Sequence, residues 1–163
     1  MIIRKAKIID LEQLVMIEQE SFPVSEVASK QVICDRINTF SNHFYVIEDN
    51  NEIVAFVNGI VSNERNLVDE MYKNTSLHNE NGRWIIIFGV ATKANYRKQG
   101  YAKTLLKEVI NDAKKEKRQG LVLACKEELI PFYSSLGFVN EGISQSKHGN
   151  EIWYSMRITF NNE

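Results

Sequence analysis

The residues of this chain best suited to chemistry form a basic, glycine-containing turn, Arg97-Lys98-Gln99-Gly100-Tyr101-Ala102. The turn follows an apolar run from Trp84 to Thr92 and opens an amphipathic segment from Ala102 to Lys117, an order that indicates strand, turn and helix. The first N–H groups of a helix lack partners within the helix and carry partial positive charge, so they can bind an anion. Gly100 leaves room for that anion beside the charges of the neighbouring arginine and lysine. The segment therefore predicts a cradle for a pyrophosphate.

Two well-known nucleotide-binding loops are excluded. No Gly-Lys-Ser/Thr follows the turn, so it is not a P-loop, and the three-glycine dinucleotide fingerprint is missing. A basic turn before a helix also occurs for structural reasons alone, so a second signal is needed.

Downstream, Leu121 to Cys125 is predicted as a short buried strand, and Pro131 to Phe138 as a helix that ends in a turn. Pro131 suits a first helical turn, and Gly137 suits the left-handed position that ends a helix.

Together the two segments resemble the GNAT superfamily of N-acetyltransferases. Its acetyl-CoA motif, Gln/Arg-x-x-Gly-x-Gly/Ala, is met by Arg97, Gly100 and Ala102, and its Tyr-x-x-Leu/Phe-Gly-Phe helix end by Tyr133 to Phe138. The resemblance implies an enzyme that transfers an acetyl group from the co-substrate acetyl-CoA to an amine. It also implies that Tyr133 is catalytic and protonates the coenzyme A thiolate as it leaves. Without the resemblance, Tyr133 could simply pack at a helix end with its hydroxyl in water.

Outside these motifs the chain is most similar to the arylalkylamine (serotonin-type) N-acetyltransferase branch, and Leu129-Ile130-Pro131-Phe132-Tyr133 is the closest piece. The animal enzymes of that branch carry two histidines on the fourth strand that help to remove the proton of the amine. The matching positions here are Ile86 and Phe88. An aliphatic amine is protonated at neutral pH, so another group must accept its proton. The alternatives are ordered water, Glu20, Tyr45, Glu70 and His78.

The superfamily resemblance also implies a fold and a set of contacts. The implied fold is α/β (α+β): a mixed, mostly antiparallel sheet of roughly six or seven strands, flanked by about four helices. Its fourth strand splays from the fifth to hold the pantetheine arm, and a backbone N–H near Val90 could polarise the thioester carbonyl. Gly89 marks a bulge or close approach there, or only relieves packing. The expected cofactor contacts are Val90, Ala91, Thr92, Arg97, Lys98, Gln99, Gly100, Tyr101, Ala102, Lys103 and Tyr133. The expected contacts of the amine are Phe22, Pro23, Phe88 and Cys125.

The remaining sequence indicates the elements that must position these residues. Asp10 is predicted to cap a first helix, with Gln13 at the capping-box position, and Pro23 to end it. A second helix is predicted from Ser29 to Phe40, and Glu64 to Tyr72 as a short helix in a polar loop. The other predicted strands are 2–6, 44–48, 53–61, 138–141 and 152–159.

Composition bounds the class of protein. The 163 residues suffice for one domain, predicted over residues 1–163, and 44% hydrophobic with 25% charged residues is a globular balance. The formal net charge of −1 gives no basic surplus of the kind that nucleic-acid partners need. Cys34 and Cys125 have no metal-ligand spacing, so no metal is expected. Lys114 to Arg118 is predicted as a solvated helix end, and Asn161 to Glu163 as a frayed terminus.

No signal pattern or membrane-length apolar span is found in the sequence, which predicts a cytoplasmic protein without a membrane partner, either monomer or homodimer. The leading hypothesis is an acetyl-CoA-dependent N-acetyltransferase in which a small primary amine, arylalkylamine-like or other, attacks the thioester directly. Acetylation of a protein lysine or N-terminus is an alternative, which would require an open and often acidic groove. A non-catalytic acyl-CoA-binding module is another alternative, which the missing strand histidines favour and Tyr133 opposes.

Overall fold

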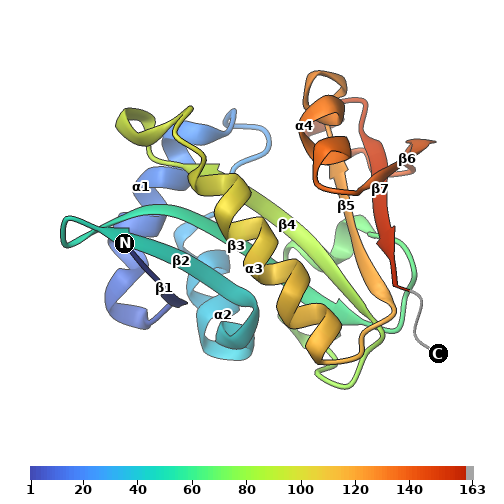
Figure 1. Cartoon of the computed structure of the whole chain (residues 1–163), viewed down its shortest axis with the longest axis horizontal. Coiled ribbons are helices and arrows are strands. Elements are labelled where there is room, and N and C mark those ends of the chain that lie inside the picture. Colours follow the sequence, from blue (N-terminus) through green and yellow to red (C-terminus); the bar gives the residue numbers. More distant parts are fainter. Residues whose placement is uncertain (161–163) are drawn as a thin grey trace. The chain divides into compact units, whose positions relative to one another are not determined.

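The computed structural model describes residues 1–160. Over these residues the strands form a seven-stranded sheet in the order β1-β2-β3-β4-β5-β7-β6 (Figure 1). The chain divides into two compact units. The first contains Met1–Gly59 and Gly89–Val109, and the second contains Ile60–Phe88 and the chain from Ile110 onward.

The elements follow the predicted order. The strands are β1 (Ile2–Lys5), β2 (Phe44–Asp49), β3 (Glu52–Ser62), β4 (Trp84–Thr92), β5 (Gly120–Cys125), β6 (Val139–Ile143) and β7 (Tyr154–Thr159). The α-helices are α1 (Leu11–Ser21), α2 (Lys30–Phe40), α3 (Tyr101–Lys115) and α4 (Ile130–Ser135). The mixed sheet with its helices confirms the predicted fold class. The helix predicted from Glu64 to Tyr72 is an exception, because only Asp69–Tyr72 of it is helical, as a 3₁₀ turn; a second 3₁₀ turn follows at Thr75–Leu77.

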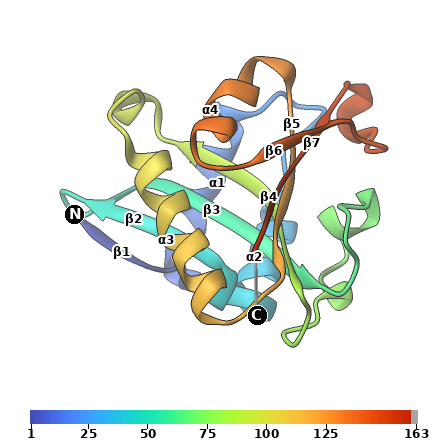
Figure 2. The ribbon, with the colours of Figure 1, turned by 45° about the vertical axis from the view of Figure 1, so that its right-hand side comes forward.

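The strands β4 and β5 pair in parallel, from Trp84 opposite Gly120 to Ile87 opposite Leu123. These described pairs stop before either strand ends, since β4 continues to Thr92 and β5 to Cys125. In the second unit β5 pairs antiparallel with β7, and β7 with β6, while α4 lies beside β6 and β7 (Figure 2).

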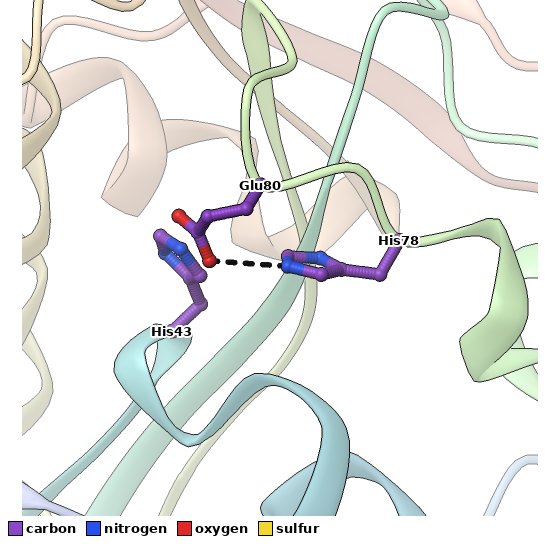
Figure 3. Close-up of side chains that lie close together, drawn as sticks. All are labelled: His43, His78 and Glu80. Carbon is purple, nitrogen blue, oxygen red and sulfur yellow. Dashed lines mark hydrogen bonds and ion pairs between the residues drawn. The ribbon is translucent and has the colours of Figure 1, made fainter.

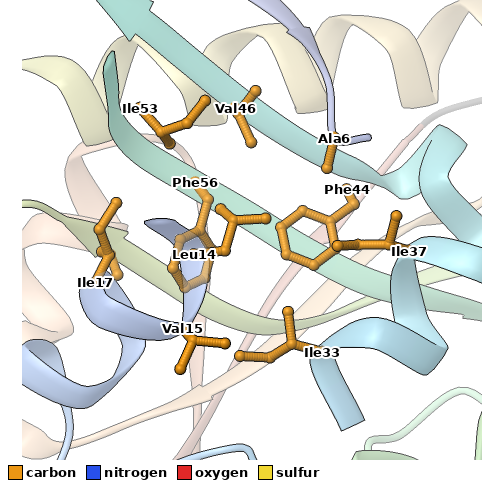
Figure 4. Packing of buried hydrophobic residues seen from close by; sticks show 11 residues of the cluster. Ala6, Leu14, Val15, Ile17, Ile33, Ile37, Phe44, Val46, Ile53 and Phe56 are labelled. Atoms are coloured by element: carbon orange, nitrogen blue, oxygen red, sulfur yellow. The ribbon is translucent and has the colours of Figure 1, made fainter. Parts of the chain in front are cut away.

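The core of the first unit lies between α1, α2 and the strands they cover (Figure 4). Both helices present one apolar stripe to the sheet, which buries apolar side chains and so stabilises the unit. The rings of Phe44 and Phe56 lie in the middle of this cluster, with centroids 5.7 Å apart. The other main members are Leu14, Val15, Ile17, Ile33, Ile37, Val46, Ile53 and Ala91.

The predicted capping box of α1 is wrong. Asp10 precedes the helix, but its side chain makes no cap bond to α1 and instead accepts hydrogen bonds from Arg4 at 2.8 and 2.9 Å and from the Lys7 N–H at 2.8 Å. Burial alone raises the pKa of Asp10, but these bonds outweigh it and hold the pKa below its usual range. Gln13 is also used elsewhere, because its Oε1 accepts from the Ile53 N–H at 2.9 Å. Hydrogen bonds to other elements therefore take the place of the predicted capping box.

The basic stretch at the end of α3 is exposed from Lys114 to Lys117, as predicted, but its last residue, Arg118, is not. Arg118 is only 8% exposed. It donates to the carbonyl oxygens of Glu80 and Gly82 at 2.6 and 2.7 Å, and to the Glu80 carboxylate at 2.9 Å. Arg118 therefore fixes the loop that leads into β4. The predicted frayed terminus, Asn161 to Glu163, lies outside the described residues.

None of the helices described over residues 1–160 combines the length and the apolar character that crossing a membrane demands.

Candidate active site

The turn between β4 and α3 has the backbone of an anion cradle. Lys98 and Gly100 both adopt positive φ, at 63° and 87°. A Cβ built on Gly100 would meet no heavy atom within 4 Å, so the turn presents open space at this point. The Gly100 carbonyl accepts the Thr104 N–H at 3.0 Å, and the first turn of α3 therefore starts directly beside this space. Its N–H groups are placed to bind an anion there.

Contacts with the end of α1 hold the turn in place. Arg97 donates from Nε to the Thr92 carbonyl at 3.0 Å and from Nη2 to Ser21 Oγ at 3.3 Å. Glu20 accepts the Ala94 N–H at 2.8 Å through Oε1. The side chain of Arg97 thus braces the turn, and the carboxylate of Glu20 has a structural role. This bond weakens the case for Glu20 as the proton acceptor.

The positive charge of the cradle comes mainly from two lysines. Lys98 and Lys103 are exposed, and among residues 1–160 neither has a charged partner. Gln99 is exposed as well and donates weakly to the Asn95 carbonyl at 3.4 Å. An anion at the turn therefore meets two uncompensated ammonium groups besides the helix N-terminus.

Tyr101, the first residue of α3, is held by contacts within the first unit. Its hydroxyl donates to Asp49 Oδ2 at 2.7 Å, and its ring packs edge-on against Tyr96 with centroids 5.9 Å apart. The hydrogen bond to Asp49 raises the pKa of Tyr101, so the phenol stays protonated and adds no negative charge near a phosphate.

The end of β4 lies next to the cradle in the first unit. Ala91 is buried in the core, whereas Val90 and Thr92 on either side are half-buried, as strand alternation requires. Among the amine-side residues, Phe22 packs against the same core and anchors the end of α1. Pro23, the next residue, is exposed. The segment predicted to contact the amine therefore combines one packed apolar residue with one exposed residue.

Tyr133 belongs to the second unit, and its phenol is set up as a hydrogen-bond donor. The residue is 6% exposed, and within residues 1–160 its hydroxyl has no hydrogen-bond partner. The rings of Phe132 and Phe138 pack edge-on against it, at 5.1 and 5.7 Å between centroids. Burial, with a smaller contribution from Cys125, raises the pKa of Tyr133 far above its ordinary value. The hydroxyl therefore keeps its proton at any physiological pH.

The end of α4 has the conformation that the sequence predicts. Gly137 adopts φ of 100° and its N–H bonds the Ser134 carbonyl at 3.1 Å, which terminates the helix. The Phe138 N–H then bonds the Tyr133 carbonyl at 3.2 Å. This backbone turn fixes the rotation of α4 and so the direction of the Tyr133 ring.

Cys125, at the end of β5, is suited to packing rather than to nucleophilic attack. Its side chain is buried, and burial together with the charge of Glu128 raises the pKa of the thiol to about 11. Since the thiolate is the reactive form, the thiol is almost inert near neutral pH. The site therefore offers no sign of a cysteine-bound acyl intermediate.

Phe88 lies at one end of a row of four aromatic rings in the second unit, and sequence reasoning missed the other three. The Phe88 ring lies 5.2 Å from Tyr72, which stacks on His148 at 4.2 Å, and His148 lies 6.0 Å from Trp153. Asp69 positions the loop that carries His148, because its carboxylate accepts the Lys147 N–H at 3.0 Å. The four rings come from separate loops and strands, so no local pattern could indicate them.

The other two candidate proton acceptors have less suitable surroundings. Tyr45 is buried on β2 with the ammonium of Lys5 over its ring at 3.3 Å from the centroid. Glu70 is exposed and accepts the side-chain amide of Asn74 at 3.3 Å.

Both nitrogens of the His78 ring have partners, and Figure 3 shows the contact of one of them with Glu80. Nδ1 accepts the Val61 N–H at 3.1 Å, and Nε2 lies 3.2 Å from Glu80 Oε1. A neutral ring that accepts at Nδ1 carries its proton on Nε2, which faces the carboxylate. The lone pair that a general base needs is therefore already used by the backbone of β3.

We expect the His78→Ala variant to retain the pH dependence of acetyl transfer. The ring fixes a loop, so its loss should lower stability by about 1–3 kcal/mol, as for other broken buried hydrogen bonds, without removing an ionisation from the rate profile. Rates of the folded variant from pH 5.5 to 9.5, with a urea melt as the stability check, test this. Loss of an inflection near the imidazole pKa together with a large fall in rate would make His78 the base instead.

The geometry can be compared with known proteins. The model described as the acetyltransferase (GNAT) family matches residues 10–138. The chain is similar to the loading GNATL domain of CurA from Lyngbya majuscula, with 15% identity over 97% of this chain and 96% of that one and a TM-score of 0.83. It is also similar to the GphF GNAT-like decarboxylase in complex with isobutyryl-CoA, with 16% identity over 98% and 99% and a TM-score of 0.80.

A third similar structure is the ribosomal-protein-S18-alanine N-acetyltransferase from Escherichia coli, with 19% identity over 99% of this chain and 95% of that one and a TM-score of 0.73. At such identities the likeness shows the fold. No curated protein matches the chain.

Proposed function

Because the chain belongs to the acetyltransferase (GNAT) family, we propose that it transfers an acetyl group from acetyl-CoA to a primary amine. The observation that carries the proposal is the turn at Gly100, where positive φ, open space and a helix start coincide. A pyrophosphate needs all three, because its oxygens must approach backbone N–H groups closely. Lys98 and Lys103 supply the remaining charge.

In the proposed reaction, the amides of the pantetheine arm pair with the edge of β4 from Val90 to Thr92. The N–H of Val90 polarises the thioester carbonyl. The neutral amine nitrogen attacks the carbonyl carbon and forms the C–N bond, the C–S bond breaks, and the thiolate takes the phenolic proton of Tyr133. Water accepts the proton of the amine, because Glu20 and His78 are held by backbone N–H groups. Water then restores the proton of Tyr133.

A small amine, arylalkylamine-like or other, is the acceptor that we place first. The apolar anchor of Phe22 and the aromatic surroundings of Phe88 support it, since aromatic rings attract both apolar groups and ammonium ions. A peptide N-terminus is the second candidate, which the likeness to a ribosomal-protein-alanine N-acetyltransferase favours.

A thiol-release assay decides between these acceptors. Acetyl-CoA is supplied with phenethylamine, an alkylamine, a polyamine, or a peptide with N-terminal alanine, and isobutyryl-CoA is tested in parallel. We expect the highest kcat/KM with acetyl-CoA and a small aromatic amine. A preference for the peptide would select the second candidate. Binding of acetyl-CoA without release of thiol for any amine would show that the protein is a non-catalytic acyl-CoA-binding module.

A further inference from the structure

A buried side-chain amide on β3 has only half of its hydrogen bonds. Asn58 is 1% exposed, and its Oδ1 accepts from Arg36 Nη1 at 3.0 Å. Within residues 1–160 its Nδ2 has no hydrogen-bond partner. Polar groups in protein interiors are nearly always paired. Among the described residues, Nδ2 is not one of the fully enclosed side-chain atoms that lack a partner, so its N–H groups can be reached by a group from outside the chain.

The orientation of this amide is fixed by chemistry. A guanidinium has only donors, so the atom of Asn58 that faces Arg36 must be the oxygen. The nitrogen is consequently turned the other way. Arg36 is itself only 3% exposed and lies within electrostatic range of the buried Glu18 carboxylate, so it is held firmly in the unit.

The nitrogen is directed toward a gap at Gly89. A Cβ built on Gly89 would lie 3.5 Å from Asn58 Nδ2 and 3.5 Å from Phe56 Cε1, with no third group from elsewhere in the described chain within 4 Å. No φ strain or backbone clash demands a glycine here, because both contacts are of ordinary van der Waals length. The missing side chain instead leaves a small space between a donor and an aromatic ring.

This space adjoins the residue to which we assign the thioester. Gly89 directly precedes Val90, whose N–H we propose as the donor to the thioester carbonyl. A group that lies over Gly89 is then either the acyl group itself or the acceptor that attacks it. Each can bring an oxygen into the space, and an oxygen is what an amide N–H binds.

Resting on the proposed function, we propose that Asn58 is a substrate-contacting residue whose Nδ2 donates a hydrogen bond to a ligand oxygen over Gly89. The ligand chemistry is a carbonyl or hydroxyl oxygen, carried by the acyl group or by the acceptor. Arg36 is the positioning residue that aims the amide, and Gly89 provides the space.

Two variants test this inference by opposite means. Asn58→Asp keeps an acceptor for Arg36 but replaces the donor with an oxygen that repels a ligand oxygen. Gly89→Ala keeps the donor but fills the space with a methyl group. Asn63→Asp, at an exposed position, is the matched control for the change in charge. We expect each of the two site variants to lower kcat/KM by about 10- to 100-fold, the loss of one buried hydrogen bond. The urea midpoint and the Kd for unacylated CoA should stay near wild type.

The remaining measurements identify the source of the oxygen. If the variants bind acetyl-CoA more weakly relative to CoA, the oxygen belongs to the acyl group. If the ratio of these two affinities is unchanged and the KM for the amine rises, the oxygen belongs to the acceptor. If Asn58→Asp fails to fold, Gly89→Ala still decides the matter. Wild-type kcat/KM in both folded variants would overturn the inference and leave Nδ2 bonded to water. Absence of transfer in the wild-type protein would instead reject the proposed function.

Discussion

Replacing Tyr133 with phenylalanine should lower the kcat of acetyl transfer by roughly 10²- to 10⁴-fold, the usual contribution of a positioned general acid. The change removes one hydroxyl that bonds to no described residue, so the edge-on packing against Phe132 and Phe138 and the stability of the fold should survive. The Kd of acetyl-CoA should change little, because the phenol acts on the leaving thiolate. Steady-state rates at saturating substrates and calorimetric titration with acetyl-CoA measure the two effects separately.

The pH dependence of the wild-type enzyme gives a second check on Tyr133. Burial raises the pKa of the Tyr133 phenol, so the phenol stays protonated at pH values where an ordinary tyrosine ionises. We therefore expect kcat not to fall as the pH rises to the ordinary pKa of tyrosine. Tyr45→Phe is a matched control, because it removes a hydroxyl from another buried tyrosine. Equal rates for Tyr133→Phe and the wild type, or equal losses in both variants, would contradict the assignment.

Replacing Gly100 with valine should weaken acetyl-CoA binding by on the order of a hundredfold. A β-branched residue disfavours the φ of 87° at this position, and its side chain would extend into the space that the pyrophosphate needs. Gly142→Val is the matched control. Gly142 has φ of 91° and likewise has no heavy atom within 4 Å of a built Cβ, but it lies on β6.

Calorimetry with acetyl-CoA and a urea melt of both glycine variants separate strain from lost binding. Similar destabilisation in the two proteins, with weakened binding only for Gly100→Val, is the expected outcome. Wild-type affinity in a folded Gly100→Val protein would show that the turn is a structural feature and not a cradle.

Local signals in the sequence sufficed for the residues whose role is set by backbone conformation. Gly137 lies at positive φ as its motif predicts, and α3 begins directly after Gly100, in the predicted turn. The order of apolar runs predicted a strand, a helix and a strand here, and the two strands, β4 and β5, pair in parallel. In these places neighbouring residues decide the structure, so a short pattern contains the information.

Contacts between distant residues were not predictable in this way. Asp10 does not cap α1, because its carboxylate forms a bidentate ion pair with Arg4 of β1. Arg118 is buried because it donates to a carbonyl oxygen of the loop at Glu80. The partners of Asn58 and of the Phe88 ring likewise come from far along the chain. Only the folded structure shows which polar side chains are paired with one another.

The transfer of a labelled acetyl group is the most direct measurement of the central claim. Incubation of the wild-type protein and the Gly100→Val variant with carbon-13 acetyl-CoA and phenethylamine, followed by mass spectrometry of the amine and titration of the thiol, records both products of the reaction. We expect labelled N-acetylamine in equal amount to the released thiol with the wild type, and little of either with the variant at limiting acetyl-CoA. Thiol released without labelled amine, or label bound covalently to the protein as an obligatory intermediate, would contradict direct transfer.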